Sequence, residues 1–232
     1  AVDLKPLANA RIVAASVAAN GDVYALTKGK LFIVRKDKTM YIQEALLRQN
    51  GGELSGSGEI VSGDKADLLI KANKVSVTPF LAEDWRAKLH GFIAGEVRVR
   101  IPMDKGANRG LTIDGDLKLE RAVLEALPIL NKIADYLKTD QFRRVELNQA
   151  SANVHFDAKG LRVENLILES KQLIALRGGF TYVDGKIDGT FDVGVTPGPL
   201  QWLPGSTERV FTTQRDGYVW APMKVSGPPD AL

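Results

Sequence analysis

Residues 174–195 read IALRGGFTYVDGKIDGTFDVGV, and they decide the fold because they contain a β-hairpin whose register follows from the sequence. Asp184-Gly185 lies between two alternating runs. Asp-Gly favours a two-residue type I′ loop, since glycine accepts the positive φ that this loop requires. With these two residues as the loop, Val183 faces Lys186 and every later pair is determined.

This register places the apolar side chains of both arms on one face. A slip of one residue would move them to the opposite face, so the pattern favours this register. Twice an aromatic ring lies opposite a glycine and covers the backbone that the glycine leaves bare. The pairs expected on the apolar face are Tyr182–Ile187, Phe180–Gly189, Gly178–Phe191, Leu176–Val193 and Ile174–Val195. The pairs expected on the wetter face are Thr181–Asp188, Gly179–Thr190 and Arg177–Asp192.

The composition is that of an ordinary globular protein. Of 232 residues, 44% are hydrophobic and 25% are charged, which argues against disorder. The net charge of +3 comes from basic residues scattered among acidic ones, so we expect no nucleic-acid partner. The absence of cysteine excludes disulfides and thiolate metal sites. No apolar run approaches the ~20 residues that span a bilayer. The chain opens without an initiator Met or a secretory signal, so we expect a processed or truncated chain whose anchor is missing.

Turn signals recur at short intervals in the first third of the chain, and the apolar period between them is two. Asn20-Gly21 and Lys28-Gly29 predict three strand-like arms, and Gly63-Asp64 predicts a later turn. Residues 92–103 and 110–120 predict two more strands, joined by the polar loop 104–110. The face expected for the first meander contains Val17, Tyr24, Leu26, Leu31 and Ile33.

Two segments change to a helical period. Residues 78–91 fit a short helix that ends near Gly91, and its apolar face is expected to contain Phe80, Leu81, Trp85 and Leu89. In residues 120–141, Pro128 lacks an N–H and clashes with the preceding turn. We therefore predict a turn followed by a helix from about Pro128 to Leu137, lying across the sheet or at one end of it. The apolar stripe consists of Val123, Leu127, Leu130, Ala134 and Leu137.

Residues 150–158 predict a strand with one apolar and one wet face. Ser151, His155 and Asp157 share the wet face and are the residue types of a catalytic triad. Same-face neighbours on a strand lie ~6.6 Å apart and project in parallel, so we expect no convergence. His90 is the only other histidine, which disfavours a multi-histidine metal site. No dinucleotide or phosphate loop is present, so we expect no enzyme and no cofactor.

Apolar strand faces outnumber the helices that could cover them. Antiparallel sheets normally cover such a face with a second sheet or with helices. We therefore predict a mainly β fold, an elongated, curved antiparallel sheet that forms a β-groove or half-barrel with one or two short helices. A sheet that closes on itself as a sandwich or barrel is the alternative. The pair Arg143-Arg144 could meet an anionic head group, although a helix-terminal or solvated position is favoured.

The C-terminal region combines a strand ending in small residues, a glycine hairpin, a Leu-Pro segment and a closing Val-x-Gly-Pro. These features are Leu176-Arg177-Gly178-Gly179, Asp184-Gly185, Trp202-Leu203-Pro204-Gly205 and Val225-Ser226-Gly227-Pro228. Earlier strands add Ala72-Asn73-Lys74-Val75 with Phe80-Leu81, and Gly91 to Gly95 with Val97 and Val99. In these features the chain, from residue 52 onward, resembles the AsmA-like family of bacterial envelope proteins.

The resemblance implies that residues 1–232 form a single AsmA-like β-rich domain, a soluble fragment of a longer membrane-anchored protein. It implies a location in the periplasm of a double-membrane bacterium, with an inner-membrane tether. It also implies a lipid-handling β-groove that serves lipid transport or outer-membrane biogenesis, and it carries no catalytic motif. The expected partners are a phospholipid or other acyl lipid, the inner membrane through the missing N-terminal anchor, and other envelope proteins.

We therefore expect a non-enzymatic lipid-binding or lipid-transport function, because acyl chains need only water-free apolar area. One alternative is a structural envelope or assembly protein whose closed β core acts through protein contacts. Another is a closed barrel that binds a small apolar ligand. The residues expected to line a lipid groove are Val154, Phe156, Val163, Ile167, Phe180, Phe191 and Val193.

Overall fold

The computed structural model describes residues 5–12, 15–19, 22–26, 28–49, 51–81, 83–103, 110–127, 130–131, 134–135, 140–171, 173–200 and 210–228. For residues 5–30, 49, 199 and 200 it describes the backbone alone. The predicted loop 104–110 lies outside the described residues except for Gly110, and so does the predicted Asn20-Gly21 turn.

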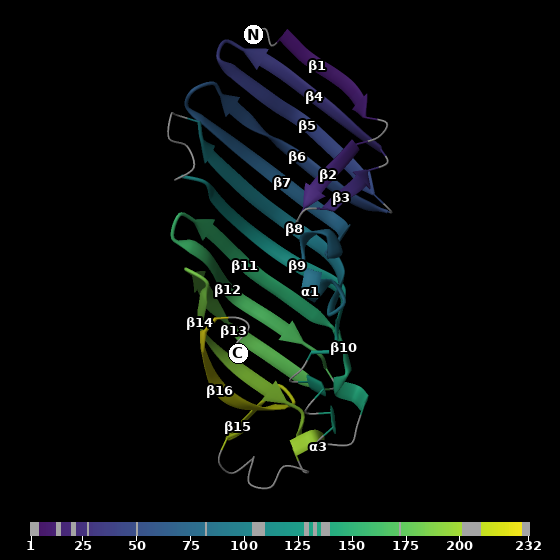
Figure 1. Ribbon diagram of the computed structural model, residues 1–232, viewed down its shortest axis with the longest axis vertical. Helices are drawn as coiled ribbons and strands as arrows, with labels where there is room; N and C mark the ends of the chain where they lie inside the picture. Colours follow the sequence, from purple (N-terminus) through teal and green to yellow (C-terminus); the bar gives the residue numbers. More distant parts are fainter. Residues whose placement is uncertain are drawn as a thin grey trace. The chain divides into compact units, whose positions relative to one another are not determined.

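The described residues are mainly β-structure, as predicted, and most strands belong to one large antiparallel sheet that does not close on itself (Figure 1). The strand order is β1-β4-β5-β6-β7-β8-β9-β11-β12-β13-β14-β16-β15, and β10 also pairs with β9. The strands are β1 (Lys5–Ile12), β2 (Ala15–Ala19), β3 (Asp22–Leu26), β4 (Lys28–Lys36), β5 (Thr39–Gln49), β6 (Gly52–Val61), β7 (Lys65–Ser76), β8 (Leu89–Pro102), β9 (Thr112–Glu125), β10 (Arg144–Leu147), β11 (Gln149–Asp157), β12 (Gly160–Glu169), β13 (Ile174–Val183), β14 (Lys186–Val195), β15 (Thr213–Arg215) and β16 (Tyr218–Gly227).

The chain divides into two compact units, and the boundary falls within β8, β9 and β11. Unit 1 comprises Ala1–Phe80, Phe92–Leu117 and Val154–Lys159. Unit 2 comprises Leu81–Gly91, Lys118–Asn153 and Gly160–Leu232. Each unit is described by itself below.

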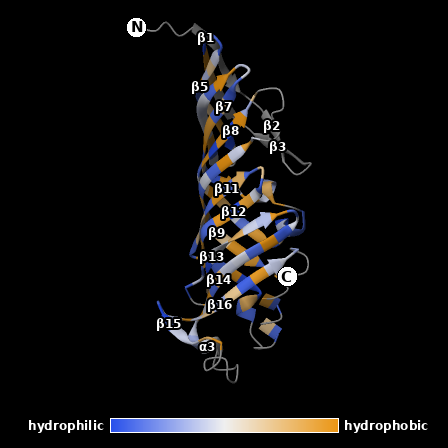
Figure 2. Cartoon of the chain, turned by 90° about the vertical axis from the view of Figure 1, so that its left-hand side faces the viewer, coloured by the Kyte–Doolittle hydropathy of each residue, from blue (hydrophilic) through white to orange (hydrophobic). Residues whose placement is uncertain are grey.

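The hairpin predicted at residues 174–195 is confirmed in every pair. β13 and β14 pair from Val183–Lys186 at the loop to Ile174–Val195 at the far end. Asp184 and Gly185 have φ values of 49° and 77°, so both loop residues adopt the positive φ of a type I′ turn. Hydrophobic and hydrophilic residues form alternating bands along strands such as β8 and β11 (Figure 2).

The first meander differs from the prediction in unit 1. Lys28-Gly29 is not a turn, because both residues lie within β4 and pair with β5. The hairpin β2–β3 forms a separate two-stranded sheet, with Val17 opposite Tyr24. Val17 and Tyr24 therefore share no sheet face with Leu31 of β4. The turn predicted at Gly63 is confirmed between β6 and β7.

A β-bulge in β12 keeps the apolar residues of that strand on one face. Val163 pairs with Phe180 and Leu166 pairs with Gly178, so β12 contains one residue more than β13 over this interval. Asn165 has a left-handed φ of 50°. The extra residue inverts the alternation, because side chains on a strand change face at every residue.

Other long strands contain the same irregularity. The pairing shifts between residues 42 and 45 of β5 and between residues 72 and 75 of β7. Lys74 of β7 and Arg121 of β9 have φ values of 54° and 51°. Polar residues therefore occupy the bulges, while the apolar residues on both sides of each bulge continue on one face.

The predicted helices are partly wrong. Residues 78–91 form two separate short helices, η1 (Thr78–Phe80) and α1 (Glu83–Arg86), and Leu89 to Gly91 already belong to β8. Phe80 and Trp85 are 50% and 42% exposed, so the predicted buried face does not form. The remaining short helices are η3 (Asp140–Phe142) and α3 (Pro197–Leu200). None of the helices in the described part of the chain has the length and apolar character that a membrane crossing requires.

The core of unit 2 lies where Leu130, Ala134 and Phe142 pack against residues of the sheet. Val123, predicted in the helix, belongs to β9. Leu130 and Ala134 are helical and buried, and the Asn131 N–H donates to the Leu127 carbonyl at 2.9 Å. The buried cluster consists of Ala122, Leu130, Ala134, Phe142, Val145, Leu147, Ala150 and Leu173. Residues 130–131 and 134–135 are helical as predicted, whereas the predicted ends at Pro128 and Leu137 lie outside the described residues.

The bulge at Asn165 gives a prediction about stability. Both Asn165→Gly and Asn165→Val remove the hydrogen bond that the Asn165 amide donates to Asn153 Oδ1 at 2.8 Å. The left-handed φ at position 165 strains valine, because valine is β-branched, but it does not strain glycine. We expect the valine variant to be about 1–2 kcal/mol less stable than the glycine variant in urea unfolding. Equal stability of the two variants would show that the bulge conformation is not maintained.

Candidate functional site

A continuous apolar face extends over four adjacent strands of unit 2. Its members follow from the registers of β12 with β13, β13 with β14, and β14 with β16. We call it the C-terminal apolar face. It contains Leu161, Val163, Leu166 and Leu168 of β12, Ile174, Leu176, Phe180 and Tyr182 of β13, Ile187, Phe191, Val193 and Val195 of β14, and Val219, Ala221, Met223 and Val225 of β16.

The two ends of this face differ in their cover. At one end, Leu168 and Ile174 pack against the buried cluster that includes Phe142. Tyr182, at the other end, and Met223, opposite Phe191, are 40% and 41% exposed. The face therefore passes from closed core to exposed apolar surface within one unit, and exposed apolar patches of this kind are typical of binding surfaces.

Two phenylalanines lie in the middle of the face, each opposite a glycine. The ring centroids of Phe180 and Phe191 are 6.4 Å apart, within the range of favourable aromatic pairs. Phe180 pairs with Gly189 and Phe191 pairs with Gly178, as predicted. A Cβ atom at Gly178 would lie 2.2 Å from the Thr190 carbonyl oxygen, so this close approach of the two strands requires glycine.

Four of the seven predicted groove residues share the C-terminal apolar face. Val163 is buried there, and Phe180, Phe191 and Val193 are half-buried. Ile167 is a correction, because it pairs with Arg177 and so lies on the opposite face. The bulge at Asn165 changes the face of every residue after it, and a strict period of two does not anticipate this.

The other two predicted residues belong to unit 1. A Cβ atom at Gly115 would lie 3.3 Å from Val154 Cγ2 and 2.9 Å from Val97 Cγ2. Val154 therefore lies beside Val97 on the apolar face of unit 1. Phe156 follows in the same strand and is 38% exposed.

Unit 1 has an apolar face whose strands β4 to β8 contain none of the predicted groove residues. We call it the N-terminal apolar face, and its alternating residues in β7 and β8 were a signal that could have identified it. It contains Leu31 and Ile33 of β4, Met40, Ile42, Ala45 and Leu47 of β5, Leu54, Gly56, Gly58 and Ile60 of β6, Ala66, Leu68, Ile70 and Ala72 of β7, and Val97, Val99 and Ile101 of β8.

A hollow of about 190 Å³ lies on this face. Gly56 is one of its lining residues and pairs with Ala45 of β5 and Ile70 of β7. The residues that line it are Ile42, Ala45, Leu47, Leu54, Ser55, Gly56, Ser57, Leu68, Leu69 and Ile70.

The opposite face of unit 1 carries ion pairs between neighbouring strands. Arg98 donates two hydrogen bonds of 2.8 Å to the carboxylate of Asp67. Arg100 donates to Asp114 Oδ2 at 2.9 Å. The Arg98 guanidinium holds the pKa of Asp67 below its ordinary value of 3.8. Cross-strand pairing of this kind keeps the face polar, because opposite charges lie side by side.

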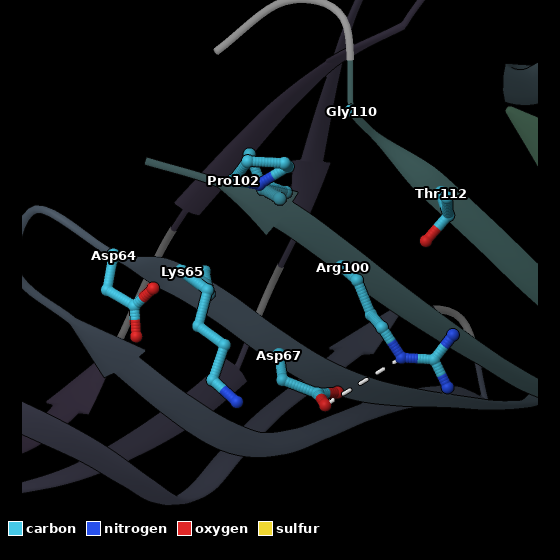
Figure 3. A pocket seen from close by; sticks show the side chains of 9 residues that line it. Asp64, Lys65, Asp67, Arg100, Pro102, Gly110 and Thr112 are labelled. Atoms are coloured by element: carbon cyan, nitrogen blue, oxygen red, sulfur yellow. Dashed lines mark ion pairs between the residues drawn. The ribbon is translucent and has the colours of Figure 1, made fainter. Parts of the chain in front are cut away.

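A larger pocket of about 520 Å³ lies at the ends of β7, β8 and β9 (Figure 3). Asp64, Lys65 and Asp67 come from one side of the pocket, and Arg100 and Thr112 from the other. Asp67 and Arg100 form an ion pair of 3.8 Å across it. Cations and carboxylates alternate in the lining, so the pocket presents no single sign of charge to a ligand.

His155 lies between two carboxylates of the polar face. Its Nδ1 donates to Asp114 Oδ1 at 2.6 Å, and its Nε2 is 3.5 Å from Asp157 Oδ2. His155 and Asp157 therefore do approach each other, contrary to the expectation of parallel side chains. Both ring nitrogens of His155 thus face carboxylates, whereas in a triad one ring nitrogen faces the nucleophile.

Arg177 lies opposite Asp192 as predicted, but its ion pairs are formed elsewhere. Its guanidinium lies 4.8 Å from the centre of the Trp220 ring and 3.1 Å from Asp216 Oδ2. Trp220 is 4% exposed, so this end of the polar face of unit 2 has a small aromatic core of its own.

The arginine pair at residues 143–144 is engaged within the chain. Arg143 donates to Asp140 at 2.9 Å, and Arg144 lies 3.5 Å from Glu146 Oε1. A role in binding an anionic head group therefore has no support from this geometry.

Comparison with known proteins adds no relative. No family model, no curated protein and no solved structure matches the chain.

The ion pair of Asp67 predicts a dependence of stability on pH. A carboxylate with a lowered pKa contributes stability that is present above the unfolded pKa and is lost as pH falls through the folded pKa. We expect the melting temperature of wild type to exceed that of Asp67→Asn at pH 6, and the difference to shrink as the pH falls below the ordinary value of 3.8. A difference that stays constant from pH 6 to pH 2 would contradict this assignment.

Proposed function

We propose that this chain is a non-enzymatic lipid-binding module of a bacterial envelope, and that the C-terminal apolar face accepts acyl chains. The observation that carries the proposal is the change along this face from closed core at Leu168 to exposed surface at Tyr182 and Met223. An acyl chain has no hydrogen-bonding groups, so it gains only from apolar area, at about 25 cal/mol per Å² removed from water.

The polar faces also support the assignment of lipid binding to the apolar faces. Cross-strand ion pairs such as Arg98–Asp67 satisfy the charges within the chain. Binding of a lipid on that face would require these charges to lose water without a new partner. The apolar faces have no such penalty.

The AsmA-like resemblance extends the proposal to the cell. On this resemblance we propose a periplasmic location, a tether to the inner membrane, and a role in lipid transport or outer-membrane biogenesis. A structural or assembly role is the second candidate, and the cluster around Phe142 and Val145 favours it, because this cluster already closes one end of the face.

A pair of glutamate substitutions on neighbouring residues tests the proposal. Phe191→Glu introduces a charge on the apolar face, and Thr190→Glu introduces the same charge on the exposed polar face of the same strand. A photo-crosslinking amino acid at Met223, which pairs with Phe191, reports lipid contact in cells. We expect Phe191→Glu to abolish the lipid crosslink and Thr190→Glu to retain it.

Circular dichroism of the purified variants provides the control for folding. Equal crosslinking by two folded variants would favour the assembly role. Mass spectrometry of material extracted from the wild-type protein would then show no stoichiometric lipid.

A further inference from the structure

Gly56 differs from other glycines of the N-terminal apolar face. A Cβ atom at Gly58 would lie 2.2 Å from the Asp67 carbonyl oxygen, and the φ of Gly58 is 153°, so the backbone requires glycine there. A Cβ atom at Gly56 would have its nearest neighbours at 3.8 Å, the Ala45 Cβ and the Leu69 carbonyl oxygen. The backbone at Gly56 would therefore accept a side chain.

Glycine within a strand weakens the strand, because it has no side chain to pack and loses the most conformational freedom on folding. At Gly56 no steric clash requires glycine, so the backbone geometry does not explain why the strand contains this weakening residue. Its consequence is the hollow of about 190 Å³, which the side chains of Leu47, Leu54, Leu68 and Ile70 surround. A larger side chain at position 56 would fill this space.

The lining of the hollow indicates what it accepts. The side chains that β5, β6 and β7 direct to this face are apolar, and the charged groups of the same strands lie on the opposite face. The hollow is smaller than the 300–1,000 Å³ typical of pockets that enclose a whole ligand. It therefore suits a short length of a flexible apolar chain that continues along the face, toward Ile33 on one side and Val99 on the other.

We propose that the hollow at Gly56 is a seat for one acyl chain, and that the missing side chain is what creates it. This inference rests on the lipid-binding function proposed above and adds a second contact region, in unit 1. Position 56 then controls how much of an acyl chain the N-terminal apolar face can hold.

The test uses a phosphatidylethanolamine with a photoactivatable diazirine in one acyl chain, presented to the purified full chain in vesicles. Mass spectrometry of the digested protein maps the labelled peptides. In wild type we expect label on β5–β7 and on the C-terminal apolar face. In Gly56→Leu we expect the label on β5–β7 to fall about ten-fold or more, the loss expected when roughly two methylenes no longer find an apolar seat.

Two further variants are the controls. Lys71→Leu adds the same side chain at an exposed residue of β7 that lies on the opposite face and does not line the hollow, and it should leave both labels unchanged. Gly56→Ala adds one methyl group and should give an intermediate loss. If the leucine variant does not fold, the alanine variant still tests the proposal.

The outcomes separate the two proposals. Label on the C-terminal face alone in wild type would overturn the acyl seat and leave the proposed function standing, as would unchanged β5–β7 labelling in folded Gly56→Leu. A wild type without any label would overturn both proposals.

Discussion

The requirement that apolar side chains stay on one face of a sheet governs this structure. Side chains alternate between faces at every residue, so a strand of ten or more residues must keep its pattern in phase over its whole length. Strands β5, β7 and β12 each contain a bulge at which the pairing shifts by one residue. The apolar pattern shifts by one residue at the same place, so each apolar face continues without interruption through the bulge.

The polar faces depend on the same alternation. Because every second residue of a strand faces away from the apolar side, charged residues on neighbouring strands meet in register. Lys71 pairs with Glu96 across β7 and β8, and Arg48 pairs with Glu53 across β5 and β6. These pairs are exposed, so each contributes little to stability, about 0.2–1 kcal/mol. Their larger effect is on specificity, since they make one face of the sheet unsuitable for an apolar ligand.

The segment that covers part of the apolar face separates closed core from exposed apolar surface. In unit 2, Leu130, Ala134 and Phe142 help to bury one end of the face, in a cluster that also contains Val145. The same strands continue beyond this cover, and there Phe180 and Phe191 are only half-buried. A core and a binding surface can thus be built from one alternating pattern. Which of the two a given residue joins depends on whether another segment packs over it.

The sequence by itself determined the mainly β class and the complete register of the hairpin at residues 174–195. Both follow from local chemistry, because Asp184-Gly185 specifies the turn and the turn specifies every pair. The sequence did not determine the face of Ile167, because a bulge in β12 changes the phase of the alternation. It also did not show that Val123 belongs to β9, because the spacing of Val123 and Leu127 fits a helix. It also did not show that Lys28-Gly29 continues a strand, since the pairing of β4 with β1 and β5 decides this. Only the tertiary structure could decide these points, because a bulge is defined by the strand opposite it, and burial is defined by the segment that packs above.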